Sequence, residues 1–141
     1  MLRSRAGLMI LGLTVLGLGG CGGSGSSVGG EASLTGVWEG AFKDSLGGLG
    51  GGSFTFTQQS GALLQGSWQV FFQTSYAIAK FNSHGLLTGT VDGSSVTAML
   101  TSQGPCSFAI QATVSGQHMS GTYTDVNCAV PETGSFDLDK T

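Results

Sequence analysis

The chain has 141 residues, enough for one domain, and 26 of them are glycine. Only five lysine and arginine residues stand against eight aspartate and glutamate residues, and both arginines lie within the first five positions. This balance argues against a nucleic-acid partner, which requires a basic surface. Regularly spaced aromatic and branched side chains predict a folded core in spite of the many Gly, Ser and Thr residues.

The first residues have the layout of an export signal. Arg3 and Arg5 give a basic start, residues 8–18 are mainly apolar, and Leu18-Gly19-Gly20 leads directly to Cys21. This order resembles the signal of bacterial lipoproteins. The resemblance implies cleavage before Cys21, a diacylglyceryl thioether on its sulfur, and acylation of the new amino group by a fatty acid such as palmitate.

Two other interpretations of this segment stay open. An ordinary secretory signal could be cut near Cys21, because Gly17-Leu18-Gly19 also has the small residues of a cleavage site. A membrane-spanning helix needs about 20 apolar residues, whereas this stretch has roughly 11 to 13. We therefore expect a lipid anchor at Cys21. In enteric bacteria an Asp after the lipidated cysteine retains the protein on the inner membrane, so Gly22 implies the outer membrane, with the domain facing the periplasm.

Three segments are expected along the chain. These are a signal peptide over 1–20, a lipidated Cys21 with a flexible linker over 21–33, and a single domain over 34–141. The linker is too polar and too rich in glycine to pack, since it contains mainly Gly and Ser. Such a linker spans about 20 Å root-mean-square, which holds the domain clear of the membrane.

From Leu34 onward the sequence predicts an all-β domain. Apolar and polar residues alternate, and turn residues recur every 8 to 15 positions. We expect a single eight-stranded antiparallel up-and-down meander barrel, with a β-sandwich as the alternative. The glycine-rich segment 44–51 is predicted to be a mobile loop, and 76–81 an additional short strand. The eight expected strands cover roughly 35–43, 52–58, 62–72, 86–92, 95–101, 106–114, 119–126 and 133–140.

Turn residues also predict the register of two hairpins. Asp92-Gly93 favours a two-residue turn, and a three-residue loop over 59–61 places Gly61 at a left-handed position. Both choices keep the apolar residues of the paired strands on one face. The expected pairs are Leu87 with Ala98, Gly89 with Val96, Phe56 with Leu64, and Phe54 with Gly66.

Cys106 and Cys128 remain as a pair once lipid occupies Cys21. A disulfide between them suits an oxidising compartment and closes a 23-residue loop. On the chain-entropy model such a bridge stabilises the fold by about 3 kcal/mol. A metal site is the competing interpretation, but His84 and His118 do not supply a zinc-binding spacing with these cysteines. We therefore expect neither a metal nor another cofactor.

The hairpin that carries the two cysteines has two candidate registers. A two-residue Gly116-Gln117 turn gives a good apolar face but leaves Cys106 opposite Asn127. A turn centred on Gln117 would place the cysteines opposite each other and turn two threonines inward. We expect the apolar register, with Val114 against Met119, Ala112 against Gly121 and Ile110 against Tyr123. A one-residue bulge over 125–127 would then bring the cysteines together.

A short phrase recurs in the domain, in which a glycine precedes a bulky residue by two positions. Both residues then lie on one face of a strand, so that small and large side chains alternate, as in the interior of a small barrel. With the Gly-x-Trp of the first strand, these phrases resemble the avidin and lipocalin group, and also small bacterial lipoproteins that carry Gly-Thr repeats. The phrases are Leu34-Thr-Gly-Val-Trp38, Leu64-Gln-Gly-Ser-Trp68, Leu87-Thr-Gly-Thr-Val91, Met119-Ser-Gly-Thr-Tyr123 and Thr133-Gly-Ser-Phe136.

The residues that bind biotin in avidin-like proteins are not matched. Trp38 is followed by Glu39 rather than by a series of polar ligands, and the Leu-Thr-Gly-Thr phrase ends in Val91 rather than Tyr. The domain also has only two tryptophans, Trp38 and Trp68. The resemblance therefore implies the fold without biotin binding.

No residue pattern indicates an enzyme. His84 and His118 both lie at expected turns, and no partner carboxylate is identifiable near either of them in the sequence. Asp92 and Asp125 lie at a turn and a strand end, where Asp serves the backbone. No Gly-x-Ser-x-Gly motif is present.

The interior of the barrel is expected to be a closed apolar core, because eight short strands leave little space. The alternative is a pocket at one mouth, gated by 44–51 and holding a small hydrophobic ligand. Candidate interior residues are Trp38, Phe42, Phe54, Phe56, Trp68, Val70, Phe72, Phe108 and Tyr123. Six of them are candidate pocket residues, namely Trp38, Phe42, Phe54, Phe56, Trp68 and Tyr123.

Three functions are compatible with these features. The first is a lipid-anchored envelope lipoprotein whose non-catalytic barrel is a structural or protein-interaction module, with other envelope proteins as partners. The second is a carrier of a small apolar ligand. The third and weakest is an enzyme of unknown type.

Overall fold

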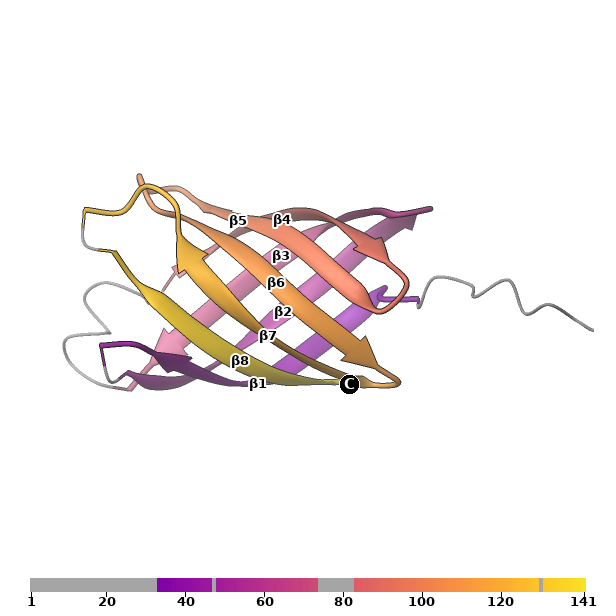
Figure 1. Ribbon diagram of the computed structural model, residues 1–141, viewed down its shortest axis with the longest axis horizontal. Coiled ribbons are helices and arrows are strands. Elements are labelled where there is room, and N and C mark those ends of the chain that lie inside the picture. Colours follow the sequence, from indigo (N-terminus) through magenta and orange to yellow (C-terminus); the bar gives the residue numbers. More distant parts are fainter. Residues whose placement is uncertain (1–32, 47, 74–82, 130) are drawn as a thin grey trace, which may run out of the picture.

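The computed structural model describes residues 33–46, 48–73, 83–129 and 131–141. In this part of the chain the protein is a closed barrel of eight antiparallel strands, without helices (Figure 1). None of the described residues forms a helix long and apolar enough to cross a membrane. The strands are β1 (Gly36–Asp44), β2 (Leu49–Ser60), β3 (Leu63–Phe72), β4 (Ser83–Asp92), β5 (Ser95–Ser102), β6 (Ser107–Ser115), β7 (His118–Asp125) and β8 (Thr133–Lys140).

The strands follow one another around the barrel in chain order. Each pairs with its neighbour in sequence, and β1 pairs with β8 from Trp38 opposite Lys140 to Asp44 opposite Gly134. This closing ladder confirms the expected up-and-down barrel and excludes the β-sandwich. The alternating pattern of the sequence is the cause, since in β6 every second side chain from Phe108 to Val114 is buried, and β3 alternates in the same way except at Gly66.

The recurrent glycine phrases interlock across neighbouring strands. In the β7–β8 ladder Gly121 lies opposite Phe136, and Gly134 lies opposite Tyr123. A Cβ atom on Gly121 would stand 2.7 Å from the ring of Phe136, and one on Gly134 would overlap the ring of Tyr123. Each glycine thus leaves the space that the large residue of the other strand fills, as the phrases predicted.

The two ends of the barrel differ. Tight connections join β2 to β3, β4 to β5 and β6 to β7, all at the end where residues 33 and 141 also lie; we call it the tight-turn end. The other four connections are longer, and the strand ends that they join all lie at the opposite, long-loop end, on the left of Figure 1. Any site at the long-loop end is therefore far from the point where residues 1–32 join the barrel.

The tight-turn end is closed by a buried tryptophan. The indole N–H of Trp38 donates to the Leu34 carbonyl at 2.8 Å, and neither side chain is exposed to solvent. The Lys140 ammonium lies 5.6 Å from the centre of the Trp38 ring and donates to the Ser33 carbonyl at 2.9 Å. These contacts join the N-terminal residues of the described barrel to the end of β8.

Two expected hairpin registers are wrong by two residues. Phe56 pairs with Gly66 rather than Leu64, and a bulge lies between Phe56 and Gln58. Leu87 pairs with Leu100 rather than Ala98, because Asp92 pairs with Ser95. A shift of two residues leaves every side chain on its face, so alternation alone does not detect it. Gly61 does have the expected left-handed conformation, with φ of 57°.

The other two expected pairs are wrong by the same two residues. Phe54 pairs with Trp68 rather than Gly66, and Gly89 pairs with Ala98 rather than Val96. In the first hairpin the observed register brings Phe56 against a glycine, whereas the expected one brought it against a leucine. Space inside the barrel therefore decides the register there.

The cysteine hairpin has the expected apolar register. Val114 lies opposite Met119, Ala112 opposite Gly121 and Ile110 opposite Tyr123. The expected bulge is wrong, because β7 ends at Asp125 without a register shift. The chain turns after the strand instead, where the Cys128 N–H donates to an Asp125 carboxylate oxygen at 2.6 Å.

The mobile loop predicted over 44–51 is wrong at both of its ends, where residues 44 and 49–51 belong to strands. Asp44 ends β1, and β2 already begins at Leu49. A Cβ on Gly50 would overlap the backbone of Phe71, and one on Gly52 would stand 2.9 Å from the Phe42 ring. These glycines allow close packing rather than motion. The additional strand expected over 76–81 lies outside the described residues.

Replacing Gly134 by alanine is expected to lower the free energy of unfolding by about 1–3 kcal/mol, because the new methyl group overlaps the Tyr123 ring. Urea denaturation measures the change. The matched control is Gly104→Ala, where the nearest atom would be 3.6 Å from the new Cβ. We expect that variant to stay within about 0.5 kcal/mol of the wild type. Equal stability of the two variants would contradict the interlocking of glycines and rings.

Candidate functional site

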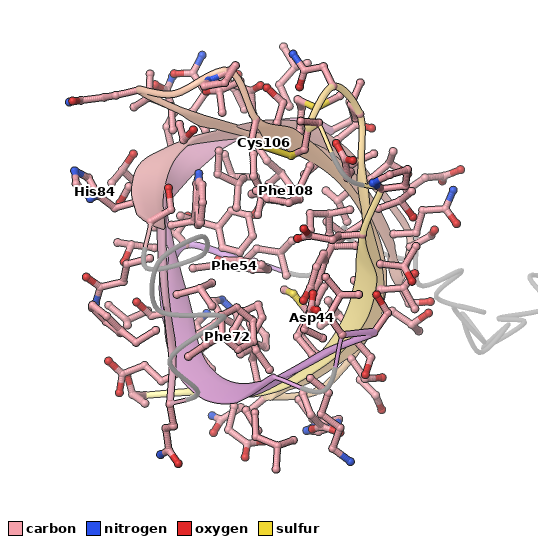
Figure 2. All side chains as sticks on the ribbon, turned by 90° about the vertical axis from the view of Figure 1, so that its left-hand side faces the viewer. Asp44, Phe54, Phe72, His84, Cys106 and Phe108 are labelled. Atoms are coloured by element: carbon pink, nitrogen blue, oxygen red, sulfur yellow. A yellow bond between two sulfur atoms is a disulfide. The ribbon has the colours of Figure 1, made fainter. Side chains whose placement is uncertain are left out.

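Seven buried side chains surround a small hollow at the long-loop end. The hollow is partly open to the outside and leaves about 20 Å³ in which the centre of a water molecule can lie. That space corresponds to roughly one water molecule. Figure 2 looks into this end and shows Phe72 and Phe108 within the outline of the barrel. The lining residues are Phe42, Trp68, Val70, Phe72, Leu100, Phe108 and Tyr123.

The aromatic rings of the hollow hold one another in place. The Phe108 ring makes edge-to-face contacts with Trp68 and Tyr123, at centroid distances of 6.0 and 5.9 Å. Tyr123 in turn contacts Phe42 at 6.4 Å. Such contacts add to the stabilisation that comes from burial and fix the ring planes. The wall of the hollow is therefore an ordered arc of four rings from β3, β6, β7 and β1.

A hydrogen bond across β4 orients Trp68. Its indole N–H donates to the Thr101 carbonyl of β5 at 3.1 Å, passing over Gly85, which lies opposite Trp68 in the ladder. A Cβ on Gly85 would stand 3.0 Å from the indole nitrogen. With its N–H bonded to the backbone, Trp68 adds only apolar surface to the hollow.

Tyr123 connects the hollow to a buried carboxylate. Its hydroxyl donates to an Asp44 oxygen at 2.9 Å, and the other Asp44 oxygen accepts the Leu46 N–H at 2.8 Å. Burial raises the pKa of Tyr123 far above its ordinary value of 10, and the bond to Asp44 raises it further. The phenol is therefore neutral and serves as a donor throughout the physiological pH range.

The described part of the long-loop end is acidic. Asp44 and Glu132 are 8% and 2% exposed. Asp125 at the end of β7 is half-buried, and its N–H donates to the Glu132 carbonyl at 2.8 Å. Lys43, whose side chain is exposed, is the one cation among the described residues at this end. Figure 2 shows Asp44 inside the outline of the barrel. Apolar rings and carboxylates thus share the same mouth.

The disulfide lies at the same end. Cys106 and Cys128 are joined across the loops that precede β6 and follow β7, with a Cα–Cα distance of 4.7 Å. The Cys106 carbonyl accepts the Ser102 hydroxyl at 3.0 Å, and Asn127 accepts the Ser107 N–H at 2.9 Å. The bridge and these bonds hold two of the four long connections together.

The six candidate pocket residues fall into two groups. Phe42, Trp68 and Tyr123 line the hollow. Trp38, Phe54 and Phe56 are buried in the core and do not line it.

Two buried carboxylates at this end did not figure among the sequence candidates. Asp44 was detectable in principle, because it continues the alternation that points Trp38 and Phe42 inward. Glu132 lies in a connection between strands, where alternation gives no signal.

The histidines lie on the outside of the barrel. His84 is exposed, and Figure 2 shows it outside the barrel outline. His118 has carboxylate partners, which the sequence did not reveal: its Nδ1 is 3.0 Å from Asp139 and its Nε2 is 3.1 Å from Asp137. The antiparallel β7–β8 ladder brings them together, since His118 lies opposite Asp139. Within the described residues, no group of three or more His, Cys, Asp or Glu could hold a metal ion.

Comparison with known proteins gives a likeness in fold. No family model matches the chain, and no curated protein matches it in sequence. A solved structure, "Structure of EF1p2_mFAP2b bound to DFHBI", is similar with a TM-score of 0.60 and 14% sequence identity. The match covers 77% of this chain and 94% of that one. At this identity the likeness shows the barrel fold alone.

His118 provides a pH-dependent contact on the outer wall. The hydrogen bond that the His118 ring donates to Asp139 is the largest cause that raises the pKa of His118 above 6.5, and the charges of Asp137 and Asp139 raise it further. A raised pKa in the folded state means that protonation favours folding. We expect this contribution to be fully present below about pH 6.5 and to be lost as the pH rises through the higher folded-state pKa.

An NMR titration of the His118 ring checks this expectation. Asp139→Asn should move the His118 pKa back toward its ordinary value. Asp92→Asn, which changes an exposed turn carboxylate on other strands, should leave it unchanged. A titration that is the same in all three proteins would contradict the assignment of the partners.

Proposed function

We propose that this protein is a lipid-anchored, non-catalytic binding module of the bacterial envelope that takes the apolar end of a small molecule into the hollow. The observation that carries the proposal is the partly open, fully apolar hollow of about 20 Å³ between ordered aromatic rings. Drug-sized ligands occupy pockets of about 300–1,000 Å³. The occupant is therefore an end group whose remainder lies at the mouth, rather than a whole molecule enclosed by the barrel.

The positions of residue 33 and of the hollow, at opposite ends of the barrel, suit a tethered binding module. The segment with Cys21 joins the barrel at residue 33, at the tight-turn end. The hollow is at the opposite end, so an anchor at Cys21 leaves the mouth accessible from the periplasm. The disulfide between Cys106 and Cys128 supports an oxidising location. The outer membrane and palmitoylation are proposed from the sequence alone.

The structural comparison supports a ligand at such a barrel. The similar protein is described as bound to DFHBI, which is a property of that protein. Its barrel fold is compatible with small-molecule binding, and the hollow of the present chain supplies a place for it.

Protein docking is a second candidate, favoured by exposed apolar side chains at the long-loop end. Leu49 and Phe71 point outward from neighbouring strands and are 57% and 54% exposed, and Leu46 and Val126 lie in connections at the same end. A protein partner that covers these residues could insert one apolar side chain into the hollow, as binding hot spots do. Both candidate functions use the hollow, but only protein docking also requires the exposed apolar side chains around it.

Filling the hollow tests the binding site. Val70→Phe adds bulk inside the hollow, whereas the matched control Gln69→Phe adds the same side chain on the outer face of β3. We expect Val70→Phe to abolish NMR shifts caused by a small alcohol with a methyl-bearing end, such as 3,3-dimethyl-1-butanol, and Gln69→Phe to retain them. Shifts that survive in Val70→Phe, or that are absent from the wild type, would contradict a site in the hollow.

The anchor has a separate test. In a bacterial host, Cys21→Ala should release the protein from the membrane fraction, because the thiol that accepts lipid is gone. Cys106→Ala combined with Cys128→Ala is the control that removes cysteines without touching the anchor. Membrane association of the Cys21→Ala protein, measured by fractionation, would contradict lipidation at this residue.

A further inference from the structure

The hollow is lined mainly by aromatic side chains and not only by apolar ones in general. Five of its seven lining residues are aromatic. Aromatic faces carry partial negative charge and attract cations, most strongly where water is excluded. We propose that the end group bound in the hollow is a methylated ammonium, an organic cation such as trimethylammonium. This inference rests on the proposed function and names the class of ligand.

The size of the hollow fits one methyl group of such a cation. The free space of about 20 Å³ accepts roughly one water-sized group, and a methyl group is of similar size. A trimethylammonium group can place one methyl between the rings and keep its other methyls at the partly open mouth. The positive charge, which is spread over the methyl groups, then lies against the rings.

Hydrogen bonding favours a methylated cation over a primary ammonium. A primary ammonium has three N–H donors that need acceptors when buried. The polar atoms of the lining rings are engaged elsewhere: the Trp68 N–H donates to Thr101, and the Tyr123 hydroxyl donates to Asp44. A quaternary ammonium has no N–H group and leaves no donor unsatisfied in this hollow.

Charge at the mouth favours a cation over an anion. Asp44 accepts two hydrogen bonds, one of them from Tyr123 in the wall of the hollow. Glu132 is buried close enough to Tyr123 to contribute to its raised pKa. Among the described residues, Lys43 is the cation at this end of the barrel. Its side chain is exposed to solvent, where salt screens its charge. In the described part of this end, the charged groups buried beside the rings are therefore carboxyl groups rather than cations.

The test compares choline with its neutral isostere 3,3-dimethyl-1-butanol, using NMR titration of the mature chain with Cys21 replaced by serine. We expect choline to bind about tenfold more tightly than the alcohol. Equal affinity, or tighter binding of the alcohol, would overturn the cation proposal and leave the proposed function intact. Binding of neither probe would overturn both the cation proposal and the binding function.

Variants locate the cause of the preference. Phe108→Leu keeps an apolar wall without an aromatic face. Asp44→Asn removes the charge and keeps the size of the side chain and one acceptor oxygen for the Leu46 N–H, while its amide NH2 can donate to the Tyr123 hydroxyl. Both should reduce the ratio of the two affinities. The control Asp139→Asn removes an exposed carboxylate on the outer wall of β8 and should keep the ratio. Circular dichroism confirms folding of each variant. An unchanged ratio in both Phe108→Leu and Asp44→Asn would overturn the proposal.

Discussion

The barrel depends on glycines that face large side chains of adjacent strands inside a narrow interior. Eight strands enclose only enough space for side chains, so large residues at every inward position would not fit. Gly121 with Phe136 and Gly134 with Tyr123 show how the β7–β8 ladder meets this limit. Gly52 does the same beside the Phe42 ring, which a Cβ atom there would approach to 2.9 Å. The high glycine content of the domain is thus a packing requirement.

The same packing sets the chemistry of the two ends. At the tight-turn end Trp38 is completely buried, and its polar atom is bonded to the Leu34 carbonyl, so its indole N–H is already engaged. At the long-loop end the rings contact one another edge to face, and their packing leaves a hollow. Asp44 is held there by Tyr123 and by the turn that follows β1. The apolar wall and the negative charge therefore come from one connected set of contacts.

Much of the fold could be predicted from alternation and turn residues, because a period of two assigns each side chain to a face. Alternation does not detect a register shift of two residues, and for that reason the predicted partner of Phe56 was wrong. Pairing Phe56 with a glycine, here Gly66, would have given the correct register. Less of the candidate site could be predicted from the sequence. The aromatic residues could be identified, whereas the His118 partners and the burial of Glu132 depend on which strands and loops meet across the barrel.

The ladder between β1 and β8 has a consequence for how the chain folds. Seven of the eight ladders join strands adjacent in sequence, whereas this one joins Trp38 to Lys140. Contacts between distant segments form slowly, because a long stretch of chain loses its freedom before they are made. Local hairpins can therefore assemble early into an open sheet with two unpaired edges. Such edges pair readily with other molecules. Until the last ladder forms, the nascent domain is thus exposed to aggregation, and closure of the barrel removes both edges.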